Sequence, residues 1–394
     1  MVVGVPRELY PGEERVALVP AVIPGLMKAG LEVVVEAGAG ITAGYPDAGY
    51  TAKGAKIVAG RAEVFRAADI IVQVLCHGSN DKTGKADLPQ FRRDQVLIGF
   101  LRPLGSLEAI QETAATGVTA FSVELMPRTT RAQSMDALSS MGTICGYKAV
   151  LIAADTLPRI FPMLTTAAGT ITPARVLIIG AGVAGLQAIA TARRLGAVTS
   201  AYDMRPAAKE QVQSLGGRFV ELPIEAKDAQ DAGGYAKAQD EEFYRKQRDL
   251  LGRVVGESDV VITAAVIPGK KSPVLVTKDM VARMAPGSVI VDLASERGGN
   301  CELTRPGEKV VANGVTIIGR INLASTVPYH ASQMYARNIT AFLQYLVHDG
   351  KLELKLDDEI VRSTLLTRGG EIVNGRVREF LSLPALATAG KGAS

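Results

Sequence analysis

The chain has 394 residues, 47% of them hydrophobic, which is enough for about two domains with buried cores. Its 44 basic and 40 acidic residues leave a net charge of +4, and the basic residues are dispersed, which argues against a nucleic-acid partner. The three cysteines are odd in number and far apart, so a disulfide framework is not expected. The three histidines and these cysteines have no metal-ligand spacing, so no metal site is expected.

The N-terminal third of the chain alternates short β-rich runs with helical ones. Runs that are almost continuously apolar, as in strands covered on both faces, occur at residues 31–36, 69–75, 96–101 and 118–123. Helices are expected between them, for example at 21–29 and 107–116, and this alternation predicts a parallel sheet. A long amphipathic helix is expected from about residue 135 to 154, ending before Pro158.

A polar loop, residues 126–136, precedes this long helix. Such a loop can direct a guanidinium, an amide and a carboxylate at one ligand. The alternative is a local role, in which Ser134 caps the helix, Asp136 complements its N-terminal dipole and Arg128 pairs with Asp136. Taken by itself, the segment favours the local role.

Three glycines, Gly180, Gly182 and Gly185, have the G-x-G-x-x-G spacing between an apolar strand and a helix at 183–195. Gly180 permits a sharp turn, Gly182 lets a pyrophosphate approach the backbone, and Gly185 lets the helix pack close to the strand. The pyrophosphate would then lie at the positive N-terminus of the helix. The segment therefore predicts a dinucleotide-binding turn.

Asp203 follows a predicted strand at 198–202 and lies 18 residues after Gly185, where a ribose-binding acid belongs. A carboxylate accepts hydrogen bonds from a ribose 2′-hydroxyl and repels a 2′-phosphate, so the site should prefer NAD(H) to NADP(H). Arg205 nearby weakens that expectation. The alternative is a glycine turn that binds no nucleotide, with Asp203 as an ordinary loop acid.

The charged, alanine-rich segment at 225–247 is interrupted by Gly233 and Gly234. One interpretation is a solvated loop that leads into a helix. The other is a mobile lid hinged at the glycines, with Tyr235 as its contact residue. The sequence favours neither.

Further strands are expected at 260–263, 288–292 and 316–318, and a further helix at 331–346. The expected fold class is therefore α/β, with two Rossmann-like domains that contain parallel sheets. The first domain would be discontinuous, comprising residues 1–138 and 328–384. Residues 139–327 would form the NAD(H)-binding domain, and residues 385–394 a disordered tail.

The N-terminus lacks the pattern of a signal peptide. The longest apolar tract, residues 176–192, is short for a membrane span and contains Gln187. The chain is therefore not expected to cross a membrane by itself.

The segment Arg-Ala-Gln-Ser-Met-Asp at 131–136 resembles the nicotinamide-side loop of the NAD(H)-binding component of proton-translocating NAD(P) transhydrogenase. Further segments are similar to this family at residues 4–17, 165–170, 232–236, 267–270 and 298–301. The resemblance extends over nearly the whole chain to about residue 380, and the loop at 131–136 is its most specific segment.

The resemblance implies a set of residues around NAD(H). The nicotinamide and its ribose would be ordered by a catalytic group, Arg128, Gln133, Asp136 and Ser139. Beside this group would lie Thr129, Thr130, Ser134 and Met135. The pyrophosphate and the adenosine ribose would contact Gly180, Ala181, Gly182, Val183, Gly185, Asp203, Met204 and Arg205. The pocket would be completed by Gly234, Tyr235, Gln247 and Val266. Val266 replaces a leucine-like position, which is a mild departure from the family.

The resemblance also implies an activity and partners. Hydride would pass directly between NADH on this chain and NADP⁺ on a partner subunit, coupled to proton movement through a membrane-spanning component. Transfer between two nicotinamide rings moves no proton, so catalysis requires only that the two C4 atoms are held about 3–3.5 Å apart. The family implies a homodimer that is cytoplasmic and peripheral on the inner membrane.

Alanine dehydrogenase is an alternative, because it resembles the chain across both domains and its carboxylate-binding arginine would correspond to Arg15. That reaction also needs a lysine and a histidine. The lysine would fall within 71–76, which contains none, and the histidine near Arg102, while His77 belongs to a different strand end. A second alternative is a catalytically silent NAD(H)-binding regulator, which the sequence does not exclude.

Overall fold

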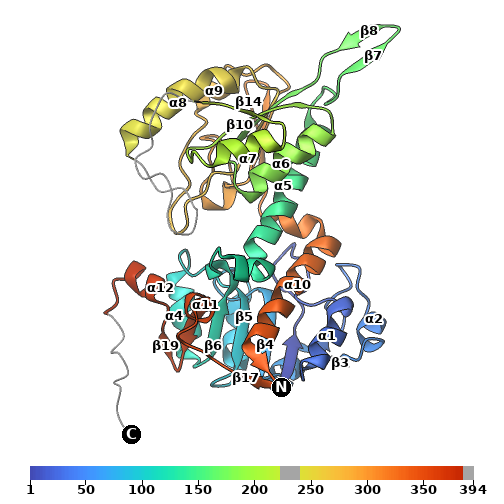
Figure 1. Cartoon of the computed structure of the whole chain (residues 1–394), viewed down its shortest axis with the longest axis vertical. Coiled ribbons are helices and arrows are strands. Elements are labelled where there is room, and N and C mark those ends of the chain that lie inside the picture. The colour runs from blue at the N-terminus through green and yellow to red at the C-terminus, as the bar shows by residue number, and fades with distance from the viewer. Residues whose placement is uncertain (222–239, 385–394) are drawn as a thin grey trace. The chain divides into compact units, whose positions relative to one another are not determined.

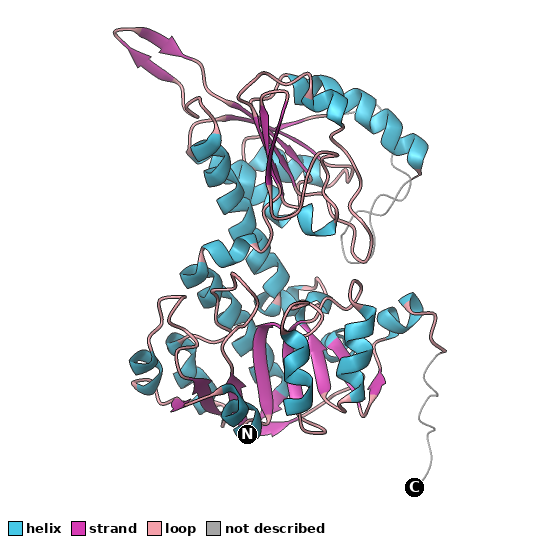
Figure 2. Ribbon diagram, turned by 180° about the vertical axis from the view of Figure 1, so that it is seen from behind, coloured by secondary structure: helices cyan, strands magenta, loops and turns pink. Residues whose placement is uncertain are grey.

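The computed structural model describes residues 1–221 and 240–384 and divides into two compact units. Unit 1 comprises Met1–Met141 and the chain from Ser325 onward, and unit 2 comprises Gly142–Ala324. Each unit is built around one large sheet with helices on both of its faces (Figures 1 and 2). The tail expected at 385–394, together with Gly234 and Tyr235, lies outside the described residues.

The sheet of unit 1 has the order β3-β2-β1-β4-β5-β6-β18-β19. Its first six strands are parallel: β1 (Val2–Val5), β2 (Glu32–Glu36), β3 (Lys56–Val58), β4 (Ile70–Leu75), β5 (Val96–Phe100) and β6 (Thr119–Ser122). The chain leaves the central strand β1 for β2 on one side and later returns to β4 on the other. The expected α/β class with parallel sheets is thus confirmed for the main body of the sheet.

The central strand β1 is absent from the predicted strands. It is only four residues long, and Gly4 weakens its apolar signal. The glycine is required by packing, because a Cβ there would lie 2.6 Å from the Cβ of Ala68 and 2.8 Å from Val64. The helix α3 (Arg61–Ala67) can therefore approach the strand closely.

Two strands at one edge of unit 1 depart from the expected parallel sheet. The strand β18 (Leu365–Arg368) pairs antiparallel with β6, and β19 (Glu371–Ile372) folds back on β18. Gly369 and Gly370, with φ of 61° and 95°, join the two strands. A two-residue connection can only link antiparallel neighbours, so the glycine pair dictates the antiparallel pairing of β18 with β19.

Helices pack on both faces of the sheet of unit 1. The set comprises α1 (Ile23–Lys28), α2 (Asp47–Thr51), α3, α4 (Leu107–Ala115), α10 (Pro328–Leu346), α11 (Glu359–Thr364) and α12 (Gly375–Phe380). Phe342 of α10 contacts Phe121 of the sheet with ring centroids 5.6 Å apart. The helix expected at 21–29 is shorter than predicted, because Pro24 has no N–H to donate to the carbonyl of Pro20.

The sheet of unit 2 has the order β11-β10-β9-β12-β13-β15-β14. Six of its strands are parallel: β9 (Arg175–Ile179), β10 (Val198–Tyr202), β11 (Arg218–Phe219), β12 (Val260–Thr263), β13 (Val289–Asp292) and β15 (Val315–Ile318). Side chains of β9 alternate between two cores. Val176 and Ile178 contribute to one core, and Leu177 and Ile179 to the other.

The helices of unit 2 supply the outer layers of these two cores. Residues of α5 (Ala137–Thr156), α6 (Val183–Arg194) and α7 (Ala208–Ser214) belong to the first core. Residues of α8 (Glu241–Gly256) and α9 (Lys278–Val281) belong to the second. The helix α8 begins within the charged segment at 225–247, whose earlier residues lie mostly outside the described ones.

Two hairpins in unit 2 were not predicted. The strand β14 (Lys309–Ala312) runs antiparallel to β15, and Asn313 and Gly314, with φ of 51° and 77°, form the turn. An Asn-Gly pair between apolar runs is a hairpin signal that the sequence offered. The second hairpin, β7 (Leu164–Thr166) and β8 (Gly169–Ile171), projects from unit 2 with all six strand residues exposed (Figure 1).

The long helix α5 begins at Ala137, two residues later than expected, because residues Thr130–Met135 form a 3-10 helix. Its apolar residues are not confined to one face, contrary to the amphipathic pattern expected. Among the described residues it is the one helix long and apolar enough to span a membrane, and 39% of its apolar window is buried. Core helices also meet this criterion, so the finding is weak evidence for a span.

Candidate functional site

The strands β9 and β12 mark the point where the strand order of unit 2 reverses. They are neighbours, with Ile179 opposite Thr263, and the following strands diverge to opposite sides of the sheet. The glycine turn follows β9, and a loop at 264–270 follows β12. Open α/β sheets bind ligands at the carboxyl ends of their strands at such a switch point.

Two of the three motif glycines are required by the protein's own packing. Gly180 has φ of 99°, and a Cβ there would lie 2.9 Å from the backbone of Ala264 and Ala265. A Cβ at Gly185 would lie 1.9 Å from the carbonyl oxygen of Gly180. These glycines therefore fix the turn and bring α6 against it.

Gly182 is different from the other two. Its φ of −76° is accessible to any residue, and a Cβ built on it meets no atom within 4 Å. Neither backbone conformation nor internal packing explains a glycine at this position. The open space beside its Cα is what a ligand that approaches the backbone closely would need.

The N-terminus of α6 is adjacent to this open space. Gly182 is the N-cap residue, so no side chain caps the helix, and the first turn contains no acidic residue. The helix has 12 residues, and its positive end therefore keeps its attraction for an anion. Backbone amides and an open approach together fit the diphosphate of a dinucleotide.

Asp203, at the carboxyl end of β10, holds the glycine turn. Its Oδ2 accepts hydrogen bonds from the amide of Ala181 at 2.8 Å and from Nη2 of Arg205 at 2.8 Å. Its Oδ1 accepts from the amide and Nε of Arg205 at 2.8 and 2.9 Å. These four donors use the ordinary acceptor sites of the carboxylate, so a ribose hydroxyl would compete with them for it. The hydrogen bonds that Arg205 donates to Asp203 raise the pKa of the Arg205 guanidinium despite its burial.

The helix α8 contributes Gln247 to the same edge of the sheet. Its Nε2 donates to the hydroxyl of Tyr202 at 2.7 Å, and its buried Oε1 has no partner within the described structure. Burial raises the pKa of Tyr202 to about 12, so this hydroxyl stays protonated. A buried amide with one unused acceptor is uncommon and is available to a ligand group.

The structure therefore brings together most of the predicted site residues of unit 2. Those at the switch-point edge are Gly180, Ala181, Gly182, Val183, Gly185, Asp203, Met204, Arg205, Gln247 and Val266. Val266 lies half-buried in the loop after β12. Gly234 and Tyr235 belong to the stretch of chain outside the described residues.

Sequence reasoning missed the residues that hold the loop after β12. Asp292 is fully buried at the end of β13, and its two oxygens accept five hydrogen bonds, from Thr263, Ala294, Asn300, Cys301 and Thr304. The Asn300 side chain in turn bonds both the amide and the carbonyl of Ala265, at 3.0 and 2.8 Å. The residues that precede Val266 are thereby fixed. Asn300 and Ala265 are 35 residues apart, so no local pattern points to their contact.

The predicted nicotinamide loop belongs to unit 1. In its 3-10 helix η4 (Thr130–Met135), Ala132 and Met135 are buried, whereas Arg131, Gln133 and Ser134 are exposed. The short helix therefore packs through two apolar residues and presents polar ones. The structure brings the rest of the predicted set into this segment and the start of α5, namely Arg128, Thr129, Thr130, Asp136 and Ser139.

Asp136 is the residue that caps α5. Its Oδ1 accepts from the amide of Ser139 at 2.8 Å, and its Oδ2 accepts from the Ser139 hydroxyl at 2.5 Å. The expectation that Ser134 caps this helix is wrong, because the 3-10 helix continues through Met135 and moves the start of α5 to Ala137. Asp136 thus complements the helix dipole as the local interpretation predicted.

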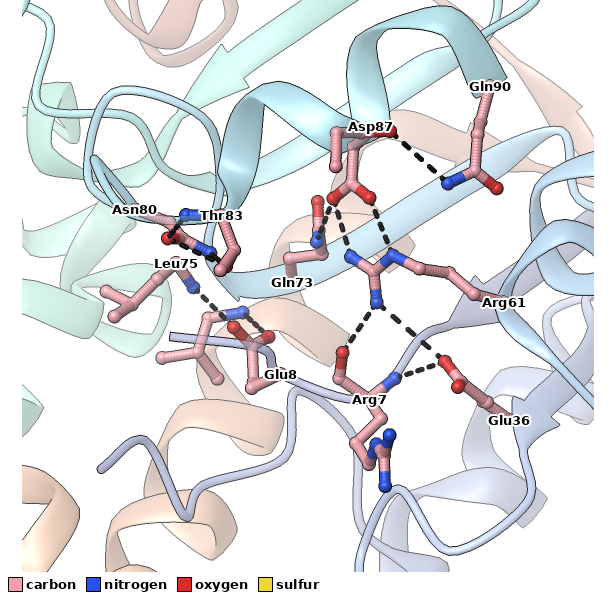
Figure 3. A network of polar contacts seen from close by, with 12 residues as sticks. Arg7, Glu8, Glu36, Arg61, Gln73, Leu75, Asn80, Thr83, Asp87 and Gln90 are labelled. Carbon is pink, nitrogen blue, oxygen red and sulfur yellow. Dashed lines mark hydrogen bonds and ion pairs between the residues drawn. The ribbon is translucent and has the colours of Figure 1, made fainter. Parts of the chain in front are cut away.

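Unit 1 has its own polar network where strands β1, β2 and β4 end (Figure 3). The Arg61 guanidinium is bidentate on Asp87, at 2.6 and 2.5 Å, and also donates to the carbonyl of Arg7 at 2.6 Å. Gln73 donates to the same carboxylate at 3.0 Å. The buried charges therefore have partners within the unit.

Glu8 is buried beside this network. It accepts hydrogen bonds from the amides of Val74 at 2.6 Å and Leu75 at 3.1 Å, which joins the segment after β1 to β4 (Figure 3). Burial and the charge of Glu13 raise the pKa of Glu8 to about 8, although these two amides lower it. Glu8 is thus mostly protonated at neutral pH.

Arg15 and His77, the arginine and the histidine considered for alanine dehydrogenase chemistry, are bound to internal carboxylates. The Arg15 side chain is only 4% exposed, and its Nε and Nη2 bind the carboxylate of Glu13 at 2.7 and 2.6 Å. Nε2 of His77 bonds Glu112 at 2.7 Å, and Glu112 also pairs with Lys85. An arginine already neutralised by an internal carboxylate is a poor receptor for a substrate carboxylate.

Two α/β units, one with a glycine turn at its switch point, define a two-domain protein of the dinucleotide-binding class. Family profiles agree with this class: the profile described as "Alanine dehydrogenase/PNT, N-terminal domain" matches residues 4–145, and "Alanine dehydrogenase/PNT, C-terminal domain" matches residues 149–375. The chain belongs to the alanine dehydrogenase/PNT family.

Individual relatives separate the two branches of that family. The chain is 47% identical over 377 residues to an NAD(P) transhydrogenase alpha subunit of Rhodospirillum rubrum, covering 95% of this chain and 98% of the relative. It is 29% identical to "Alanine dehydrogenase" of Bacillus subtilis, covering 94% and 92%. The crystal structure of transhydrogenase from Sinorhizobium meliloti superimposes with a TM-score of 0.82 at 41% identity, covering 95% and 100%.

The three motif glycines predict different effects on stability. Gly185→Ala should lower the free energy of unfolding by about 3 kcal/mol, because the new methyl group overlaps the carbonyl of Gly180. Gly182→Ala should change it by no more than about 1 kcal/mol, because its Cβ points into open space. Urea unfolding of both variants measures the difference. Equal losses would contradict the packing described for this turn.

The raised pKa of Glu8 predicts a pH dependence of stability. The folded protein holds the Glu8 proton more tightly than the unfolded chain, so the protonated carboxyl favours folding. The contribution of Glu8 to stability is complete below about pH 4.5 and is lost as the pH rises to about 8. One such group has a slope of about 1.4 kcal/mol per pH unit between the two values. Thermal unfolding at a series of pH values should show this slope, and Glu8→Gln should remove it. An identical slope in both proteins would refute the assignment.

Proposed function

We propose that the chain is the NAD(H)-binding component of a proton-translocating NAD(P) transhydrogenase. The observation that carries the proposal is Gly182, a glycine that neither packing nor backbone conformation requires, next to the uncapped N-terminus of α6. This combination fits a diphosphate that contacts the backbone. The high identity to a transhydrogenase subunit supports the specific reaction.

The residues proposed to hold NAD(H) form two groups, one at the switch-point edge of unit 2 and one in the loop before α5. The turn Gly180–Val183 would bind the diphosphate through backbone amides, and Asp203 would receive the adenosine ribose as Arg205 moves aside. The unused oxygen of Gln247, together with Val266, would complete this side of the pocket. The Arg128–Asp136 loop and Ser139 would order the nicotinamide and its ribose, and Tyr235 would close over the nucleotide.

The proposed reaction needs little from the protein beyond placement. When bound, the dihydronicotinamide supplies the hydride, which passes to NADP⁺ on a partner subunit without a proton. Gln133, exposed on a short helix, would align the ring rather than exchange protons. The commitment of Arg15 to Glu13 and of His77 to Glu112 favours this reaction over reductive amination.

The remaining partners follow from the same proposal. An NADP(H)-binding subunit would face this chain, and a membrane-spanning component would couple the reaction to proton movement. The chain would be cytoplasmic and peripheral on the inner membrane through these partners.

We also propose a homodimer. The exposed hairpin of unit 2 carries Leu164 and Ile171, which are 43% and 49% exposed, and Met163 beside it is 62% exposed. A groove of about 760 Å³, lined among others by Leu157, Ile160 and Phe161, lies next to the hairpin. Apolar side chains on a projecting arm favour burial against a second chain.

Three measurements in order test the proposed function. Fluorescence titration should show NADH binding to the purified chain, and Gly182→Ala should weaken it about tenfold or more at nearly unchanged stability. NADH oxidation with pyruvate and ammonium should then be absent. Addition of a cognate NADP(H)-binding subunit should start hydride transfer. Turnover with pyruvate would identify an alanine dehydrogenase, and inactivity with the subunit present would favour a regulator.

Gln133→Asn should separate alignment from binding. The shorter amide should slow hydride transfer about ten- to a hundredfold, because transfer depends on the distance between the rings. The dissociation constant for NADH should change by less than about threefold, since other residues supply most of the binding. Single-turnover kinetics and a binding titration measure the two effects. Gln111→Asn, an exposed position on α4, is the matched control. Equal losses of rate and affinity would count against an aligning role.

A further inference from the structure

The helix η4, which carries Gln133, is fastened by two residues from much later in the chain. Nη2 of Arg131 donates to Oδ2 of Asp358 at 2.8 Å. Nδ2 of Asn338, on α10, donates to the carbonyl oxygen of Ser134 at 2.8 Å. The two contacts lie on either side of Gln133 in the sequence. All of these residues belong to unit 1.

The two oxygens of Asp358 have separate tasks. Oδ1 accepts from the amides of Ile360 and Val361, at 2.8 and 3.2 Å, and so caps α11. Oδ2 accepts from Arg131 and from the hydroxyl of Tyr345, the latter at 2.7 Å. One carboxylate therefore connects η4, α10 and α11.

The surroundings keep this carboxylate charged. Partial burial of Asp358 opposes ionisation, but hydrogen bonds from Tyr345 and from the amides of α11 hold the pKa of its carboxyl below the ordinary value. The guanidinium carbon of Arg131 also lies 5.9 Å from the centre of the Tyr345 ring, where a cation is attracted to the ring face. The carboxylate of Asp358 and the ring of Tyr345 thus together hold the Arg131 side chain.

The contacts of Asp358 affect the orientation of the helix η4 more than the stability of the fold. The Arg131 side chain is 58% exposed, and an ion pair as exposed as this contributes little to folding. The helix that it holds is a single short stretch of 3-10 structure with two buried residues, Ala132 and Met135. Short 3-10 helices have poor hydrogen-bond geometry, so an external anchor decides where their exposed side chains point.

We propose that Asp358 is a positioning residue for hydride transfer, acting through Arg131 to hold the Gln133 segment in its productive place. Asn338 fixes the other end of the segment, and Tyr345 fixes Asp358. The proposal rests on the proposed function of the chain. Because transfer is sensitive to displacements of about 1 Å, loss of the anchor should slow the reaction far more than it weakens binding.

The variant Asp358→Asn tests the contact between Asp358 and Arg131. Asparagine is an equally good N-cap, so Oδ1 still serves α11, while the charge opposite Arg131 is lost. With the full chain and its NADP(H)-binding partner, the single-turnover rate should fall about tenfold or more. NADH affinity should stay within about twofold. Asp357→Asn, an identical change at the exposed neighbouring position, should leave both unchanged.

A double-mutant cycle gives a readout that a general structural defect would not produce. Arg131→Ala should match the loss of rate caused by Asp358→Asn, and the double variant should be no slower than either single variant. Additive losses, an unchanged rate in Asp358→Asn, or a parallel loss of NADH affinity would each overturn the proposal.

Hydrogen exchange separates this proposal from the proposed function. Amides of residues 130–136 should exchange faster in Asp358→Asn than in Asp357→Asn, whether or not the chain catalyses hydride transfer. Unchanged exchange would show that Asp358 does not hold this segment in place. Faster exchange in a chain whose unmodified form shows no hydride transfer with its partner keeps the anchor but removes the proposed function, and with it the positioning role.

Discussion

The lack of room for a Cβ between Gly185 and the carbonyl of Gly180 governs the arrangement of the candidate site. A single added carbon at residue 185 would lie 1.9 Å from that oxygen, so α6 has one tolerated distance from β9. This distance places the start of α6 beside the ends of β9 and β12. Asp203 then secures the turn from β10, and the open face of Gly182 remains for a ligand. The strand order sets the position of the candidate site, and the glycines leave the space that a ligand needs.

The two units follow one plan and use its switch point differently. The central strand of unit 1, β1, lies between β2 and β4, and the central strand of unit 2, β9, lies between β10 and β12. In each unit the carboxylate of an aspartate accepts a hydrogen bond from the amide at the start of this strand. The amide of Val2 donates to Asp69 and that of Arg175 to Asp259, both at 2.8 Å. Unit 2 leaves the carboxyl end of its central strand clear. Unit 1 fills the corresponding region with the ion pairs around Arg61 and with the buried Glu8 (Figure 3). The same scaffold thus has an open edge in unit 2 and, in unit 1, an edge whose polar groups bond one another.

Patterns local in sequence predicted most of the fold. Buried parallel strands are runs of Val and Ile, and the glycine turn has fixed spacing, so both could be recognised from a few adjacent residues. The antiparallel β18 was missed because its partner β6 lies more than 200 residues earlier. The contact from Arg131 to Asp358 was missed for the same reason, and the contact of Asn300 with Ala265 joins residues that are 35 positions apart. The error at Ser134 is local: the sequence does not reveal where the 3-10 helix gives way to α5.

The interrupted course of unit 1 has a consequence for how the chain folds during synthesis. Unit 2, from Gly142 to Ala324, is translated in one continuous stretch and leaves the ribosome before the end of unit 1. The helix α10 and the strands β18 and β19, which complete the core and the sheet edge of unit 1, emerge after unit 2. We expect the second unit to fold first and the first unit to wait, with one sheet edge unpaired, until β18 and β19 have emerged. Asn338 and Asp358, which fasten the segment around Gln133, therefore reach it only after unit 2 has been made.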